Sequence, residues 1–116
     1  MAGREGVTTW REFGHWREGV IHALEGGLWL HRFTLQGEPW AHLVSADRER
    51  LLAAGRRLGV PERWLQYRPL KDPRSGGRVE AWHWDLRNEP LARALALAAP
   101  RVPFRGTGSI SEEETR

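Results

Sequence analysis

Apolar residues recur along this chain with two different periods, which predict how helices and strands alternate. At the start, Trp10 and the apolar positions after it fall at roughly helical spacing as far as Leu24. The segment Thr9-Trp10-Arg11-Glu12 has the form of a capping box, in which a Thr and a Glu three residues later satisfy each other's backbone N–H groups. We therefore expect a helix over residues 9–25, which Gly14 could break.

An alternating pattern follows and predicts two strands. Apolar and polar residues alternate over 28–35, and a second short run covers 40–44 after a turn that contains Gly and Pro. Together these runs predict a β-hairpin. The chain then returns to helical spacing, with Ser45 or Asp47 as the helix cap and Gly59 as its end.

The second half of the chain predicts two more strands and one more helix. In chain order, the predicted elements are an extended segment at 64–68, a loop at 69–78 rich in Pro, Gly and charge, a strand at 79–86, a helix that Asn88 caps and Pro100 ends, and a further edge strand if Val102 and Phe104 pair with the sheet. Alternation within the 79–86 strand places His83 and Asp85 on one face and its two tryptophans on the other.

This order of elements predicts the fold class and the domain organisation. Helices alternate with pairs of strands, which indicates a single small α/β domain with a mixed sheet of four to five strands packed by three helices. At 116 residues the chain is close to the commonest domain size. We expect the domain to cover residues 1–105, and the polar segment 106–116 to be a disordered tail.

Composition excludes several classes of protein. The chain has no cysteine, so disulfide scaffolds, zinc–thiolate sites and cysteine nucleophiles are excluded. No run of 18 or more apolar residues is present, so we expect no membrane span. The first six residues lack the apolar stretch of a secretory signal, and a cytoplasmic protein is therefore expected.

The charge distribution indicates a basic body. The net charge is +3, but the segment 106–116 carries three acidic residues and one arginine, so the remaining residues hold 17 basic and 12 acidic side chains, a net charge of +5. All basic residues except Lys71 are arginines, which suit phosphate groups but also accumulate through the codon usage of GC-rich genomes. The candidates for contact with nucleic acid are Arg56, Arg57, Arg63, Trp64, Arg68, Arg74 and Arg78.

A second candidate site lies where two predicted strands are each followed by a predicted helix. His42 stands near the end of one strand and His83 near the end of another, and each is followed by a helix cap. Because ligands of open α/β sheets gather beyond the carboxyl ends of strands, we expect a polar pocket there if the two strands are neighbours. The predicted pocket residues are His42, Ser45, Gln66, His83 and Asp85.

Three interpretations of this pocket stay open from sequence alone. His42, His83 and Asp85 could ligate a divalent metal ion, since imidazole and carboxylate are common ligands. Alternatively, His83 could act as a general acid or base that a carboxylate orients. In the third interpretation these side chains only pair with each other. The sequence therefore assigns no metal ligands, catalytic residues or cofactor.

Four short stretches resemble a bacterial family of proteins of unknown function, DUF4031. They are His42-Leu43-Val44-Ser45, Leu58-Gly59-Val60, Trp64-Leu65-Gln66 and His83-Trp84-Asp85-Leu86, within about residues 40–100. The chain departs from the family pattern at Ala46, where the family has Asp, at Leu52, where it has His, and at Pro90-Leu91, where it has a basic pair. The resemblance implies the place of a site but no activity, and these departures indicate either a member without catalysis or a distant relative of the family.

These observations lead to an expected function and two alternatives. The leading hypothesis is a non-catalytic module that binds nucleic acid or another polyanion through its arginines. The first alternative is a metal- or histidine-dependent phosphoesterase or nuclease-like enzyme. The second is a protein-interaction or self-associating module that uses some of the seven tryptophans.

Overall fold

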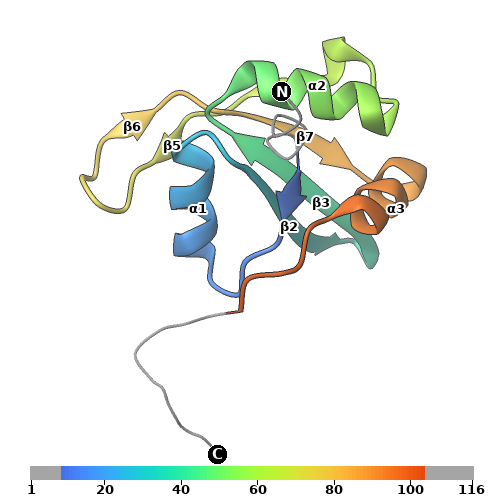
Figure 1. Ribbon diagram of the computed structural model, residues 1–116, viewed down its shortest axis with the longest axis horizontal. Coiled ribbons are helices and arrows are strands. Elements are labelled where there is room, and N and C mark those ends of the chain that lie inside the picture. Colours follow the sequence, from blue (N-terminus) through green and yellow to red (C-terminus); the bar gives the residue numbers. More distant parts are fainter. Residues whose placement is uncertain (1–8, 104–116) are drawn as a thin grey trace, which may run out of the picture.

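The computed structural model describes residues 9–103, which form three α-helices, a five-stranded mixed sheet and a separate two-stranded hairpin (Figure 1). The helices are α1 (Trp16–Leu24), α2 (Arg48–Leu58) and α3 (Asn88–Leu97), with a 3₁₀ turn, η2, at Glu62–Trp64. The strands are β1 (Trp10–Arg11), β2 (Leu28–Leu35), β3 (Glu38–Ser45), β4 (Gln66–Tyr67), β5 (Leu70–Lys71), β6 (Arg78–Val79) and β7 (Trp82–Leu86). The predicted α/β fold is confirmed. The predicted limit at 105 and the tail at 106–116 lie outside the described residues.

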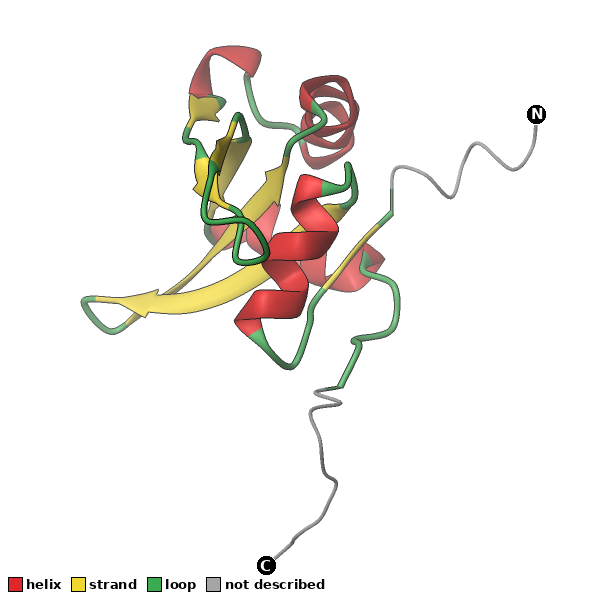
Figure 2. Cartoon of the chain, turned by 90° about the vertical axis from the view of Figure 1, so that its left-hand side faces the viewer, coloured by secondary structure: helices red, strands yellow, loops and turns green. Residues whose placement is uncertain are grey.

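The sheet is built on the predicted hairpin. Its strand order is β1-β2-β3-β7-β4, in which β1 and β2 are parallel and every other pair is antiparallel. The tight turn between β2 and β3 places Gln36 at φ 53° and Gly37 at φ 80°. Positive φ at both central residues matches the twist of a hairpin, and the turn projects from the body of the molecule (Figure 2).

Helices cover the two faces of the sheet unequally. α2 and α3 pack on one face, where the larger core contains Leu30, Leu43, Leu51, Trp84 and Leu91. On the other face, α1 forms a smaller apolar cluster with the sheet. We call this second face the α1 face. One short helix cannot cover it completely, so part of it is left to polar side chains.

The start of the chain differs from the prediction. The expected helix at 9–25 is confirmed only beyond Gly14, as α1, whereas its first part and the capping box are wrong because residues 10–11 form β1. Trp10 is fully buried, and its indole N–H donates to the carbonyl of Ala94 at 2.8 Å. Strand pairing buries this large side chain in the main core, which a helix starting at Thr9 does not do.

The α2 prediction is confirmed in detail. Asp47 is the N-cap, and its carboxylate accepts from the backbone N–H of Arg50 at 3.1 Å. Ser45 instead accepts from the backbone N–H of Asp47 at 2.9 Å. At the other end, Gly59 has φ 76°, the left-handed conformation that commonly ends a helix.

Four later predictions are corrected. The ends of the expected loop at 69–78 pair as β5 and β6, and the expected strand at 79–86 is divided into β6 and β7. Asn88 is not the cap of α3, because the N-cap is Arg87 and Asn88 lies at φ 55°. Val102 makes only an isolated parallel bridge to Phe13, and Phe104 lies outside the described residues.

Candidate metal centre

Strand pairing brings three polar side chains together on the α1 face. β7 lies beside β3, and His42 is paired with Asp85 across the two strands. Side chains two apart on a strand share a face, so His83 lies on the same side as Asp85. We call His42, His83 and Asp85 the His/Asp cluster.

Both imidazoles of the cluster face the same carboxylate oxygen. His42 Nδ1 lies 2.9 Å from Asp85 Oδ1, and His83 Nε2 lies 3.2 Å from that oxygen. The two rings are 4.6 Å apart between centroids and tilted by 60°. The other carboxylate oxygen, Asp85 Oδ2, accepts from the side-chain amide of Gln66 at 2.6 Å. The amide therefore fixes the carboxylate while the two rings converge on it.

The spacing of the cluster suits a divalent transition metal ion. One ligand atom from each residue can be chosen so that all lie within 4.8 Å of one another. Tetrahedral zinc with bonds of about 2.1 Å separates its ligand atoms by roughly 3.4 Å, so small side-chain movements would suffice. Two histidines and one carboxylate form a known ligand set for catalytic metals, and a hydrogen bond such as that from Gln66 orients such carboxylates.

Burial and charge affect the two histidines differently. The His42 side chain is 35% exposed and that of Asp85 is 34%, whereas His83 is only 10% exposed. Burial lowers the pKa of His83, and the neighbouring His42 lowers it further, although Asp85 acts in the opposite direction. A lowered pKa keeps His83 neutral near pH 7, the state in which imidazole binds metals.

Two hollows flank the cluster and meet at it. The central hollow, of about 390 Å³, is lined by Val20, Trp29, His31, His42, Val44, Gln66, Arg68, Leu70, His83 and Asp85. The tryptophan hollow, of about 450 Å³, is lined by Trp40, Arg63, Trp64, Gln66, Asp85 and Arg87. Because Gln66 and Asp85 line both, one ligand can reach the cluster and either hollow.

The structure brings together four of the five predicted pocket residues. The strands of His42 and His83 are neighbours, which was the condition for the pocket. They run antiparallel, however, so the residues meet in the middle of the α1 face and not beyond a shared strand end. Ser45 is not part of the group, because it lies three positions after His42 and accepts a hydrogen bond at the start of α2.

Two residues near the site, His31 and Trp40, were not predicted from sequence, whereas Arg87 was expected to converge with His42 and His83 if their strands were neighbours. His31 pairs with His42 across the hairpin, and Trp40 and Arg87 line the tryptophan hollow. The Arg87 guanidinium lies 4.9 Å from the centre of a Trp40 ring. Alternation already placed His31 with Trp29 and Phe33, so that signal was in the sequence. The contact between Trp40 and Arg87 depends on pairing between distant strands and left no local signal.

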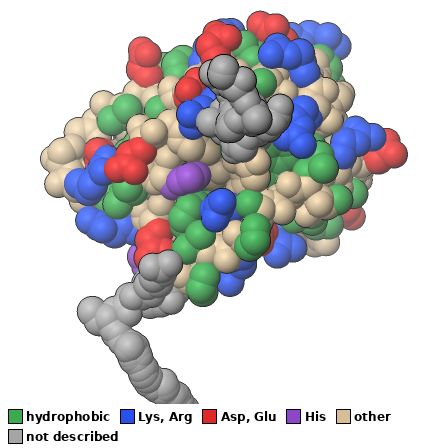
Figure 3. Space-filling view, in the orientation of Figure 1, with side chains coloured by type: hydrophobic (Ala, Val, Ile, Leu, Met, Phe, Trp, Pro, Cys, Tyr) green, Lys and Arg blue, Asp and Glu red, His purple; other side chains and the backbone are tan. Residues whose placement is uncertain are grey.

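The predicted nucleic-acid contacts are spread over several elements. Arg56 and Arg57 lie at the end of α2, Arg63 and Trp64 in η2, Arg68 after β4, and Arg74 and Arg78 in and beside the turn between β5 and β6. Arg74 is already engaged by Asp72 and Glu25. On the face drawn in Figure 3, basic side chains are interspersed with acidic ones. Of the seven, only Arg63, Trp64 and Arg68 line the two hollows.

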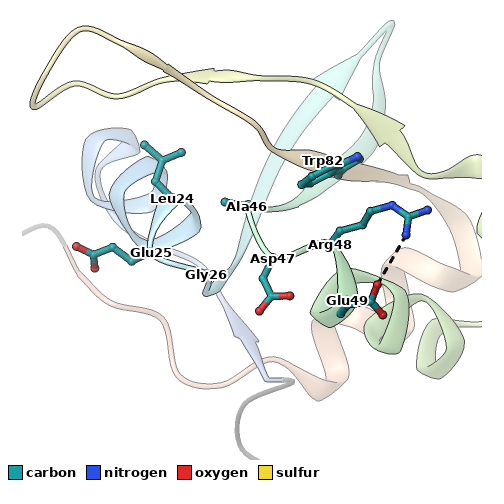
Figure 4. A pocket seen from close by; sticks show the side chains of 8 residues that line it. All are labelled: Leu24, Glu25, Gly26, Ala46, Asp47, Arg48, Glu49 and Trp82. Carbon is teal, nitrogen blue, oxygen red and sulfur yellow. Dashed lines mark ion pairs between the residues drawn. The ribbon is translucent and has the colours of Figure 1, made fainter.

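A further hollow at the start of α2 is a weaker candidate (Figure 4). Its charged side chains have partners within the chain. Asp47 caps the helix, Arg48 lies 3.8 Å from Glu49, and Glu25 pairs with Arg74 at 2.9 Å. These contacts give the side chains a structural role.

Comparison with known proteins gives one match. A family model described as "Protein of unknown function (DUF4031)" matches residues 30–114, a span that contains the His/Asp cluster and the aromatic and cationic residues of the tryptophan hollow. No curated protein and no solved structure shows significant similarity to this chain. Within residues 9–103, none of the helices is both long and apolar enough to cross a membrane.

Proposed function

This chain belongs to the DUF4031 family, and we propose that it is a metal-dependent hydrolase that acts on phosphate esters. The observation that carries the proposal is the convergence of His42, His83 and Asp85 within 4.8 Å of one another on a partly exposed surface. The cluster lies inside the span that the family model matches.

The geometry favours a metal ion over acid–base catalysis by a lone histidine. A catalytic histidine needs one nitrogen on its carboxylate and the other free to meet substrate. Here two histidines face one oxygen of Asp85. A cation bound between the two rings and this oxygen would use lone pairs from all three residues. Three protein ligands leave a coordination position open, the arrangement typical of catalytic zinc.

The surroundings of the cluster suit a phosphate ester. A bound divalent ion makes water acidic enough to attack at neutral pH and polarises a phosphoryl oxygen. The water oxygen forms a bond to phosphorus, the bond from phosphorus to the ester oxygen breaks, and the leaving alcohol takes up the proton that the water releases. Arg68, which lines the central hollow, supplies positive charge beside the phosphate.

Metal binding is the first test of this proposal. Zinc or manganese is titrated into chelator-treated protein by calorimetry, and one ion per chain is expected. His83→Ala and Asp85→Asn each remove a ligand and are expected to abolish stoichiometric binding. Gln66→Ala removes the hydrogen bond to the carboxylate but no ligand atom, and such changes weaken metal affinity about 10–100-fold. His15→Ala, which alters a histidine at the start of α1, is the matched control.

Hydrolysis is the second test. The zinc- or manganese-loaded protein is expected to release nitrophenol from mono- or bis-nitrophenyl phosphate, whereas the chelated protein and His83→Ala are not. Zinc binding that His83→Ala leaves intact would contradict the assignment of the centre. Stoichiometric zinc binding without hydrolysis of either ester would contradict the proposed enzymatic activity, while the assignment of the metal site would still hold.

A further inference from the structure

The tryptophan hollow combines unpaired cations with an exposed aromatic ring. Arg63 and Arg87 both line it, and among residues 9–103 neither forms an ion pair with a carboxylate. Two guanidinium groups against the one carboxylate of Asp85 give the lining of this hollow a net positive charge, which attracts anions. Arginine binds phosphate oxygens through paired N–H donors, so a phosphate is the anion that this geometry suits.

Trp64 gives the hollow a second property. Its side chain is 52% exposed, and among the described residues no aromatic ring packs against it. The backbone at this position is anchored, since the Trp64 N–H donates to the Pro61 carbonyl at 3.0 Å and the adjacent Leu65 packs on the main core. Trp40 differs, because Arg87 already lies over its ring. Trp64 therefore offers an exposed stacking surface on an anchored part of the backbone.

From this arrangement we propose that the ester bound at the metal centre is a nucleoside phosphate, whose base stacks on Trp64 while its phosphate lies between Arg63 and the His/Asp cluster. The inference rests on the proposed function, because the His/Asp cluster would hold the metal ion that binds the phosphate. The hollow of about 450 Å³ falls within the range of small-ligand pockets. The same chemistry is present in a free nucleotide and in one unit of a single strand.

The test separates the base from the phosphate. Zinc-loaded protein is titrated by calorimetry with methylene-phosphonate analogues of adenosine monophosphate and of ribose 5-phosphate, neither of which can be hydrolysed. The nucleotide analogue is expected to bind roughly tenfold more tightly, since stacking on an aromatic side chain is worth about that factor or more. Trp64→Ala should remove this difference without weakening the sugar phosphonate. Trp16→Ala, which alters an exposed tryptophan on α1, should keep it.

The arginine variants test the phosphate end. Arg63→Ala should weaken both analogues several-fold, whereas Arg78→Ala, on β6 outside both hollows, should weaken neither. Equal affinity for the two analogues in the parent protein would overturn the inference. If zinc binding and ester hydrolysis persisted in that case, the proposed function would still stand. Failure of the parent protein to bind zinc would instead overturn the proposed function.

A last comparison identifies the source of the nucleotide. A short oligoadenylate that binds no more tightly than the single nucleotide would support a free nucleotide as the ligand. Much tighter binding of the oligonucleotide, with a steep salt dependence, would support a unit of a single strand. In either case Trp64→Ala must weaken binding, and an unchanged affinity in that variant would overturn the stacking role.

Discussion

At the scale of single residues, Asp85 organises the candidate site. Its carboxylate receives His42 and His83 on one oxygen and Gln66 on the other. Asp85 also lines both hollows, so it is the point where metal and ligand would meet. The amide of Gln66 limits rotation of the carboxylate and therefore holds the oxygen between the two rings.

His22 leads to a residue-scale prediction about pH. Burial lowers its pKa, Arg11 and Arg50 lower it further, and Glu25 opposes them. The unfolded chain therefore takes up a proton at a higher pH than the folded chain does. The free energy of unfolding should stay level above about pH 6.5, where the unfolded histidine is neutral, and decrease as the pH falls from there towards the lower folded pKa.

Urea unfolding at pH 7.5 and at more acidic pH measures this effect. The decrease in unfolding free energy should be smaller in His22→Gln than in the parent protein, because the variant has one fewer half-buried histidine to charge. Part of the decrease should remain, since the pKa values of His31 and His83 are also lowered by burial. An identical decrease in the variant would show that His22 does not contribute.

At the scale of elements, α2 depends on close contact with a tryptophan. A Cβ atom added to Gly55 would lie 2.4 Å from the Trp84 ring, and the Trp84 indole donates to the Leu51 carbonyl of the same helix at 2.8 Å. Glycine thus lets helix and sheet approach each other, at a cost in helix propensity of about 1 kcal/mol relative to alanine.

Gly55→Ala is therefore expected to destabilise the protein despite the better helix propensity of alanine. Overpacking of a core typically costs 1–3 kcal/mol, which outweighs the gain of about 1 kcal/mol. Denaturant unfolding measures the difference. Gly37→Asn is the control, because nothing lies within 4 Å of that position and asparagine tolerates its positive φ. A Gly55→Ala variant more stable than the parent would contradict the close packing.

Elements with a local pattern could be predicted, whereas elements set by distant pairing could not. The β2–β3 hairpin and α2 have clear periods and clear turn or cap residues, and the two faces of β7 follow from alternation. β1 has only two residues, too few for a period, and its partner lies beyond a helix. Four of the five pocket residues could be predicted individually, but their meeting depends on β3 pairing antiparallel with β7, which joins His42 and Asp85 across a separation of 43 positions.

At the scale of the whole molecule, the structure extends beyond the region that defines the family. The family model matches residues 30–114, yet β1, α1 and the first residues of β2 precede it. These elements contribute to both apolar cores. Trp10 lies in the main core, and Val20 and Ala23 form the smaller one with Trp29 and Val44. The His/Asp cluster therefore rests on a sheet whose stability depends on residues outside the family region.

Trp10→Ala tests this dependence. The substitution removes a fully buried ring and its hydrogen bond to Ala94, and comparable tryptophan truncations cost about 3–5 kcal/mol. Trp16→Ala removes a ring that is 58% exposed and should change the unfolding free energy by about 0.5 kcal/mol or less. If the two variants unfolded at the same denaturant concentration, β1 would not be part of the folded core. The expected result is that only Trp10→Ala is destabilised. Under conditions where this variant is folded, its zinc affinity should equal that of the parent protein, because Trp10 does not line either hollow.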